Sequence, residues 1–143
     1  MASKRLETKE GLRCGESLIT TINPSSPTYV LVVEDEPLSR MHALNLVEEA
    51  GYVAIEASNA DEAISILEAR KDIRIVFTDI DMPGSMDGLK LARAIRHRWP
   101  PIELILTSGH FNLNDSELPE RGRFFPKPYR DDQIISALQG FAS

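Results

Sequence analysis

The stretch VFTDIDMPGSMDG, from Val76 to Gly88, places two acids, Asp79 and Asp81, where an apolar run gives way to a loop. An unbroken apolar run is typical of a strand in a parallel sheet, because helices cover both faces of such a sheet. Ligands of open parallel sheets bind beyond the carboxyl ends of the strands, so both acids stand where a site is expected. A D-x-D pair in this position occurs in several kinds of phosphate chemistry, and the rest of the chain decides between them.

Strand and helix patterns alternate along the chain on both sides of this stretch. Apolar runs predict five strands, at residues 28–33, 52–57, 73–77, 102–107 and 123–125. Apolar residues at helical spacing predict helices at 37–50, 60–67, 87–98 and 130–141. The segment 110–122 predicts only a short or irregular helix, interrupted by Pro119. This alternation indicates an α/β fold, a doubly wound five-stranded parallel sheet with helices on both faces.

The length and composition of the chain limit its organisation and its partners. Its 143 residues suggest one domain, with residues 1–27 as a flexible polar leader and residues 28–143 as the folded part. The formal net charge of −6 argues against binding to nucleic acid. No apolar run approaches the roughly 20 residues of a membrane span, and no signal peptide precedes the domain. The single cysteine, Cys14, cannot form an internal disulfide, so we expect a cytoplasmic protein.

Polar residues follow four of the five predicted strands. They are Glu34 and Asp35, Asp79 and Asp81, Thr107 and Ser108, and Lys127. Two carboxylates about 4 Å apart repel each other by roughly 4 kcal/mol at an effective dielectric constant of 20, so such a cluster needs cations. One cation is Lys127, and a hard ion such as Mg²⁺ prefers the oxygens that the acids offer. The pattern therefore predicts a Mg²⁺-assisted phosphoryl-transfer site in which a carboxylate is the nucleophile.

Each of these features also has a simpler structural explanation. Acids at 34–36 complement the dipole of the helix that follows, and a Thr-Ser-Gly sequence after a strand is commonly a turn or a cap. A lone lysine beside two prolines is usually solvated. The occurrence of all of them at the same end of successive strands favours the functional interpretation.

The segments VLVVEDEP, VFTDIDMPGSMDG, LILTSG and FFPKPY together resemble the receiver domain of two-component response regulators, over about residues 28–141. This resemblance implies a flavodoxin-like fold with strand order 2-1-3-4-5. It also implies a role for each residue of the predicted site. Asp79 is the phosphoacceptor, Thr107 and Lys127 contact the phosphoryl group, and Mg²⁺ is held by Glu34 (through water), Asp35, Asp79 and the backbone carbonyl of Asp81.

Three further positions match the resemblance. Phe124 stands at the aromatic switch position, Ser108 is small enough to admit the phosphoryl group, and Gly109 lies, with Asp81, where receivers tune dephosphorylation. The implied function is a signalling switch rather than an enzyme, since receivers catalyse only their own phosphorylation and dephosphorylation. The implied phosphodonor is a sensor histidine kinase or a histidine phosphotransfer protein.

This sequence departs from the family pattern in three places. The loop MPGSMDG, residues 82–88, is one residue longer than the common form, and the helix predicted at 110–122 is weak. The weak helix puts dimerisation through that face in doubt, so we expect a monomer or a weak dimer. No effector domain follows the last predicted helix, so the expectation is a single-domain regulator that acts through contacts with other proteins.

Two other functions compete with the switch. The motif FTDIDM also resembles the nucleophile motif of haloacid-dehalogenase-type phosphatases, in which the second aspartate is an acid/base. That motif normally follows the first strand of its domain, whereas two strand–helix units precede it here. A phosphorylation-independent interaction module is the other alternative, and the complete set of acid, hydroxyl and lysine residues argues against it.

Overall fold

The computed structural model describes residues 27–83, 86–110, 113 and 116–141. Strands and helices alternate through most of these residues. The strands are β1 (Tyr29–Val33), β2 (Val53–Ala57), β3 (Ile73–Asp79), β4 (Glu103–Ser108) and β5 (Gly122–Pro126). The helices are α2 (Pro37–Glu49), α3 (Ala60–Ala69), α4 (Gly88–Arg98) and α5 (Asp131–Gly140).

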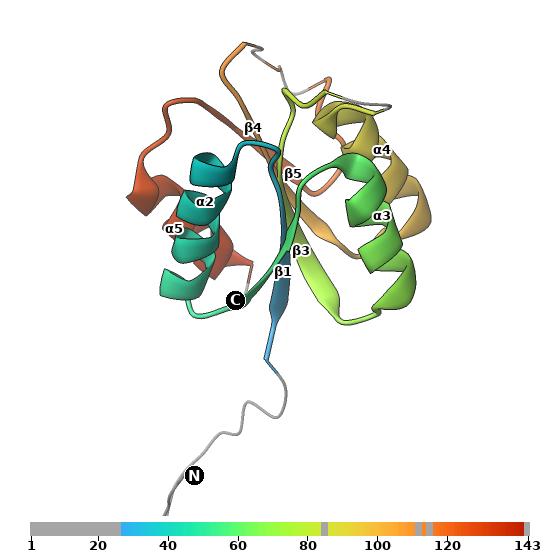
Figure 1. Cartoon of the computed structure of the whole chain (residues 1–143), viewed down its shortest axis with the longest axis horizontal. Coiled ribbons are helices and arrows are strands. Elements are labelled where there is room, and N and C mark those ends of the chain that lie inside the picture. The colour runs from blue at the N-terminus through green and yellow to red at the C-terminus, as the bar shows by residue number, and fades with distance from the viewer. Residues whose placement is uncertain (1–26, 84–85, 111–112, 114–115, 142–143) are drawn as a thin grey trace, which may run out of the picture.

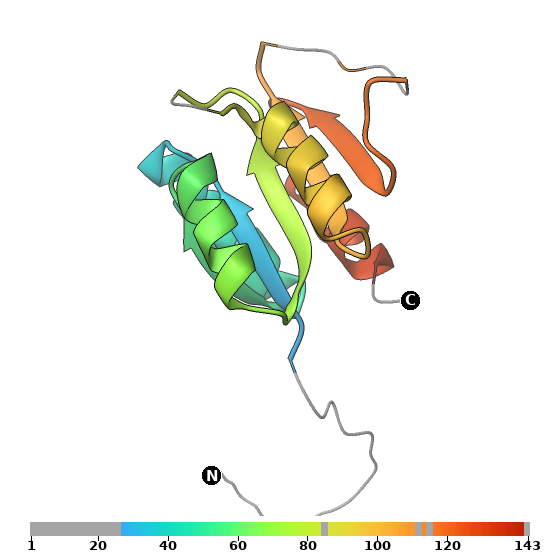
Figure 2. The ribbon, with the colours of Figure 1, turned by 90° about the vertical axis from the view of Figure 1, so that its right-hand side faces the viewer.

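The five strands form one parallel sheet in the order β2-β1-β3-β4-β5, which confirms the predicted fold and strand order. Helices α2 and α5 cover one face of the sheet, and α3 and α4 cover the other (Figures 1 and 2). All five strands therefore end at the same edge, the upper one in Figure 1. This edge is where the sequence places the polar residues.

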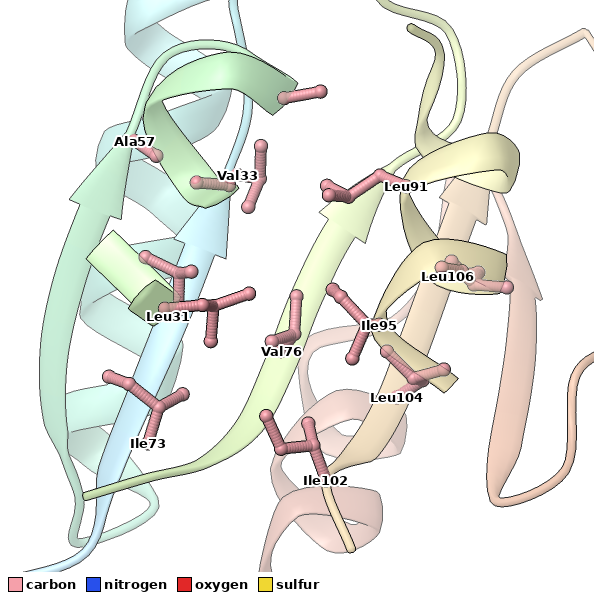
Figure 3. Packing of buried hydrophobic residues seen from close by; sticks show 14 of the residues in the cluster. Leu31, Val33, Ala57, Ile73, Val76, Leu91, Ile95, Ile102, Leu104 and Leu106 are labelled. Carbon is pink, nitrogen blue, oxygen red and sulfur yellow. The ribbon is translucent and has the colours of Figure 1, made fainter. Parts of the chain in front are cut away.

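The core explains why the strands read as continuous apolar runs. Along β1, Val30 and Val32 belong to the cluster that packs under α2 and α5, whereas Leu31 and Val33 belong to the cluster under α3 and α4. Figure 3 shows this second cluster, with Leu31 and Val33 among its labelled side chains. Because both faces are buried, alternation between apolar and polar residues is absent. Full burial of each such side chain stabilises the fold by roughly 1.5–3 kcal/mol.

Side-chain caps fix where the helices begin, and hence where the loops of the site end. The Glu36 carboxylate accepts a hydrogen bond from the backbone N–H of Ser39 (2.7 Å), with Pro37 as the first residue of α2. Asp87 accepts one from the N–H of Lys90 (2.9 Å) and begins α4. Both acids thus have a structural role as helix caps, and for Glu36 this agrees with the simpler explanation of an acid beside the start of a helix.

The segment between β4 and β5 differs most from a regular α/β repeat. Its described residues, 109–110, 113 and 116–121, form bends and turns and contain no helix. This agrees with the short or irregular helix predicted there. The leader predicted at 1–27 lies, up to residue 26, outside the described residues, as do Gly84 and Ser85 of the longer loop. None of the helices in the described part of the chain is long and apolar enough to cross a bilayer.

Candidate functional site

The carboxyl ends of β1, β3 and β5 bring acids and a lysine into one cluster. Carboxylate oxygens of Glu34, Asp35 and Asp79 lie within 4.8 Å of one another. Lys127 Nζ lies 3.3 Å from Asp79 Oδ1 and 3.4 Å from Glu34 Oε1. Glu34 and Asp79 are buried, whereas Asp35 is exposed. Residues that are 93 positions apart in the chain therefore meet at the predicted edge of the sheet.

Thr107 joins this cluster from β4. It is the residue of β4 that pairs with Asp79 in the parallel register, and it is buried. Its backbone carbonyl accepts a hydrogen bond from the N–H of Ile80 (2.8 Å), which ties the end of β4 to the residue after Asp79. The structure thus brings together the side chains of Glu34, Asp35, Asp79 and Lys127, and it places Thr107 on the strand beside Asp79. The chemical roles assigned to these residues stay predictions.

Close packing of α4 against the end of β3 fixes the position of Asp79. Gly88, the first residue of α4, lies so near that a β-carbon there would overlap the backbone carbonyl of Asp79. Its N–H also donates a hydrogen bond to the carbonyl of Ile80 (3.1 Å). Only glycine permits this approach. This role of Gly88 is not predicted above, although a glycine directly after the capping Asp87 is a signal visible in the sequence.

The electrostatics of the cluster reflect an excess of acid over base. Burial raises the pKa of Asp79 above its ordinary value, although Lys127 acts in the opposite direction. Burial also raises the pKa of Glu34, and the neighbouring Asp79 carboxylate adds to this effect. Burial lowers the pKa of Lys127, but the charges of Glu34 and Asp79 outweigh it, so the lysine pKa is raised. The site therefore favours a further cation.

The donor set fits a hard divalent cation. Among the described residues, Asp79 Oδ1 is the buried side-chain oxygen that has no hydrogen bond, even though Lys127 lies at ion-pair distance. Burial of such an atom destabilises the folded protein unless a cation or a hydrogen-bond donor contacts it. Three carboxylates within 4.8 Å offer the oxygen ligands that Mg²⁺ prefers. The residues present thus fit Mg²⁺, while the predicted part played by the backbone carbonyl of Asp81 stays a prediction.

The side chain of Asp81 lies away from this cluster of carboxylates and contacts the end of β4. Its carboxylate accepts hydrogen bonds from Ser108 Oγ (2.9 and 3.0 Å to its two oxygens) and from the backbone N–H of Gly109 (2.9 Å). His110 Nδ1 lies 3.3 Å from Asp81 Oδ2. Burial raises the pKa of Asp81, but these hydrogen bonds and His110 outweigh it and lower the pKa below its usual value. The sequence did not indicate this role of the Ser108 hydroxyl.

Two further residues support the site in ways that the sequence did not indicate. Arg40, on α2, donates to the backbone carbonyl of Glu34 (2.8 Å) and to the Glu56 carboxylate on β2 (3.0 Å). Tyr129 follows the cis Lys127–Pro128 peptide, and its ring stacks on His42. Burial, with smaller effects of nearby acids, raises the pKa of Tyr129 to about 12. Arg40 also reaches a second strand, 16 residues away, and Tyr129 contacts a helix near the other end of the domain, so neither contact has a local sequence signal.

A hollow of about 360 Å³ opens beside Lys127. Its lining residues are Ser39, His42, Lys127, Pro128 and Tyr129. The first turns of α2 form its border. They carry Leu38 and Met41, which are 71% and 56% exposed. These are the two most exposed large hydrophobic residues in the described part of the chain. The helix that borders the hollow thus also carries two exposed apolar side chains.

Comparison with known proteins agrees with this geometry. The profile of the response regulator receiver domain matches residues 30–139. The nitrogen assimilation regulatory protein NtrX of Azorhizobium caulinodans is 33% identical over 110 residues, which are 74% of this chain and 24% of that protein. The positive alginate biosynthesis regulatory protein of Pseudomonas aeruginosa is 36% identical over 115 residues (77% and 45%). The sensor kinase CckA of Brucella abortus is 34% identical over 119 residues (80% and 12%). The chain thus spans less than half of each of these relatives.

Solved structures share the same fold. A response regulator receiver protein from Sinorhizobium medicae has a TM-score of 0.74 at 24% identity and covers 83% of this chain and 99% of its own. The response regulator TrrA of Thermotoga maritima, solved in complex with Mg²⁺-BeF, has a TM-score of 0.70 at 27% identity (79% and 97%). Fold, site geometry and sequence similarity lead to one conclusion: this chain belongs to the response regulator receiver domain family of two-component signalling systems.

Proposed function

We propose that this chain is a phosphorylation-activated switch that accepts a phosphoryl group on Asp79 from the phosphohistidine of a partner protein. One observation carries the proposal. The buried Asp79 carboxylate, with one oxygen free of hydrogen bonds, lies within 4.8 Å of two other carboxylates and 3.3 Å from a lysine. A structural ion pair would match the charges instead of leaving an excess of acid, and this excess suits a site that binds a cation and a phosphoryl group.

Each group of the cluster has a part in the transfer. An Asp79 oxygen attacks phosphorus, a P–O bond forms, and the P–N bond of the phosphohistidine breaks as its electron pair returns to the imidazole. The ammonium group of Lys127, already between Asp79 and Glu34, offsets charge on the phosphoryl oxygens. Glu34, Asp35 and Asp79 would hold Mg²⁺. When bound, Mg²⁺ neutralises charge on the transferred group and orients it. Thr107, the buried residue of β4 that pairs with Asp79, would supply a hydroxyl donor to the phosphoryl group.

The exposed apolar residues of α2 suit the approach of the phosphodonor. Leu38 and Met41 lie on the helix that begins directly after Glu34 and Asp35, beside the hollow next to Lys127. A partner that delivers a phosphohistidine to Asp79 must cover this border of the site. Burial of both side chains in the complex would favour docking by roughly 1.5–3 kcal/mol for each residue.

The proposed role is signalling, and the chemistry is limited to the chain's own phosphorylation and dephosphorylation. Phosphorylation replaces the single negative charge of Asp79 with nearly two and adds strong acceptor oxygens at the end of β3, which is enough to reorganise neighbouring loops. The proposed partners are a sensor histidine kinase or a histidine phosphotransfer protein, together with a downstream protein. Action as a single domain, as a monomer or weak dimer in the cytoplasm, is part of the proposal.

The competing phosphatase function is distinguished by turnover. The purified chain would be incubated with Mg²⁺ and acetyl phosphate, and separately with p-nitrophenyl phosphate, while bound phosphate and released product are measured. A switch is labelled by acetyl phosphate to at most one phosphoryl group per chain and does not turn over p-nitrophenyl phosphate. Continuous hydrolysis of p-nitrophenyl phosphate, lost in Asp81→Asn, would instead support a phosphatase with Asp81 as its acid/base. No labelling and no turnover would favour the phosphorylation-independent module.

A further inference from the structure

We propose that the Asp81 carboxylate is a latch that holds the chain after β4 beside the phosphoacceptor, and that a phosphoryl group on Asp79 releases it. Asp81 then acts as a positioning residue through its side chain. This inference rests on the proposed function, because the release requires phosphorylation of Asp79.

The latch consists of contacts between Asp81 and three consecutive residues. Its carboxylate accepts hydrogen bonds from Ser108 Oγ and from the N–H of Gly109, and it lies 3.3 Å from the ring of His110. Ser108 Oγ in turn accepts a hydrogen bond from the N–H of His110 (3.0 Å). One carboxylate thus organises the first turn beyond the sheet, and its displacement would loosen all of these contacts together.

The contacts of Asp81 begin at the residue where the backbone hydrogen bonds between β4 and its neighbouring strands end. The carbonyl of Thr107 is bound by the N–H of Ile80, and the carbonyl of Ser108 by the N–H of Lys127, each at 2.8 Å. Beyond Ser108 no further hydrogen bond to β3 or β5 holds the described residues Gly109 and His110. Gly109 is exposed, and a β-carbon built there would lie 4.0 Å from that of Lys127. Asp81 therefore controls the segment that leaves the sheet at the edge of the site.

The charge of Asp79 couples the site to the latch. Asp79 lies two residues before Asp81, and Thr107, which pairs with Asp79 in the sheet register, directly precedes the Ser108 that binds the Asp81 carboxylate. A phosphoryl group replaces the single charge of Asp79 with nearly two and adds three strong acceptor oxygens. It thus opposes the Asp81 carboxylate more strongly and competes with it for the Ser108 hydroxyl. Both effects favour release of Gly109 and His110.

Amide-proton exchange with water, measured by NMR on the full chain labelled with ¹⁵N, tests the latch and its release separately. Before any phosphorylation, Asp81→Ala should raise the exchange rates of the Gly109 and His110 amides at least tenfold. Asp87→Ala is the matched control, because Asp87 is an acid of the same loop that caps α4, and it should leave both rates unchanged. Unchanged rates in Asp81→Ala would overturn the latch, whatever the result of phosphorylation.

The release is measured with Mg²⁺ and beryllofluoride, a mimic of the phosphoryl group. In the wild type, the mimic should raise the exchange rates of both amides at least tenfold. In Asp81→Asn, whose amide group can replace the hydrogen bonds without the charge, the mimic should raise them less than half as much. Shifted resonances around Asp79 with unchanged exchange at Gly109 would overturn the release alone. If the mimic causes no shifts around Asp79, the proposed function and the release both fail, whereas the comparison without the mimic still decides the latch.

Discussion

Replacement of Asp79 by asparagine should stabilise the metal-free protein, because it removes one charge from a cluster with excess acid. At an effective dielectric constant of 20, each carboxylate within 4.8 Å opposes the Asp79 charge by at least about 3.5 kcal/mol. Lys127, at 3.3 Å, favours that charge by about 5 kcal/mol. The two carboxylates therefore outweigh the lysine by about 2 kcal/mol, and burial acts in the same direction. We expect Asp79→Asn to raise the free energy of unfolding at pH 7.5 by roughly 1–2 kcal/mol.

The direction of the Asp79 pKa shift predicts how the stability difference between Asp79→Asn and the wild type changes with pH. The pKa of Asp79 is raised in the folded state, so the folded protein keeps its proton at pH values where the unfolded chain, with an Asp pKa of about 3.9, has lost it. The wild type loses stability as the pH rises through this window. The advantage of Asp79→Asn should therefore be absent below the unfolded pKa and complete above the folded pKa.

Urea denaturation in EDTA, at pH 7.5 and near pH 4, measures this advantage directly. Asp87→Asn is the control, since asparagine caps helices as well as aspartate does, and its free energy of unfolding should change by less than about 0.5 kcal/mol. Added Mg²⁺ should reverse the order, because it binds and stabilises the wild type more than the variant. Destabilisation by Asp79→Asn at pH 7.5 in EDTA, or an equal gain at both pH values, would refute the electrostatic reasoning.

Three other substitutions test separate parts of the account. The double variant Leu38→Ser with Met41→Ser should slow phosphoryl transfer from a phosphorylated histidine kinase at least tenfold and leave labelling by acetyl phosphate unchanged. The control Val53→Ser, at the β2 edge, should alter neither rate. Equal loss with both phosphodonors would rule out a docking role for Leu38 and Met41. Gly88→Ala should lower the free energy of unfolding in urea by at least about 2 kcal/mol, because the methyl group overlaps the carbonyl at the end of β3; a neutral result would mean that α4 can shift. Arg96→Ala should lower the free energy of unfolding by roughly 2–4 kcal/mol, because the Arg96 guanidinium donates to three backbone carbonyls in the segments that lead into β4 and β5. A decrease of less than about 0.5 kcal/mol would contradict that role.

Much of the fold could be predicted from the sequence because each local signal agrees with its neighbours. The unbroken apolar run before Asp79 indicates a strand buried on both faces, and β3 is such a strand. The acids, hydroxyl and lysine that follow the strands meet because parallel strands end at one edge. Strand ends thus define the positions of most of the candidate site.

The remaining features of the site depend on tertiary contacts that no local sequence pattern indicates. The Asp81 side chain could have joined the acids of the candidate metal site, but hydrogen bonds from Ser108 and Gly109, 27 and 28 residues away, direct it to the end of β4. Arg40 supports Glu34 only because α2 folds back along β1 and β2. Such pairings follow from the tertiary structure, and sequence spacing does not reveal them.

The most direct test of the central claim is the site and metal dependence of phosphoryl labelling. Intact-mass spectrometry after incubation with acetyl phosphate would follow the wild type, Asp79→Asn and Asp81→Asn, each with Mg²⁺ and with EDTA. The account predicts labelling of the wild type and of Asp81→Asn with Mg²⁺, and no labelling of Asp79→Asn or of any variant in EDTA. Labelling of Asp79→Asn at the rate of the wild type, with loss of labelling in Asp81→Asn, would contradict it.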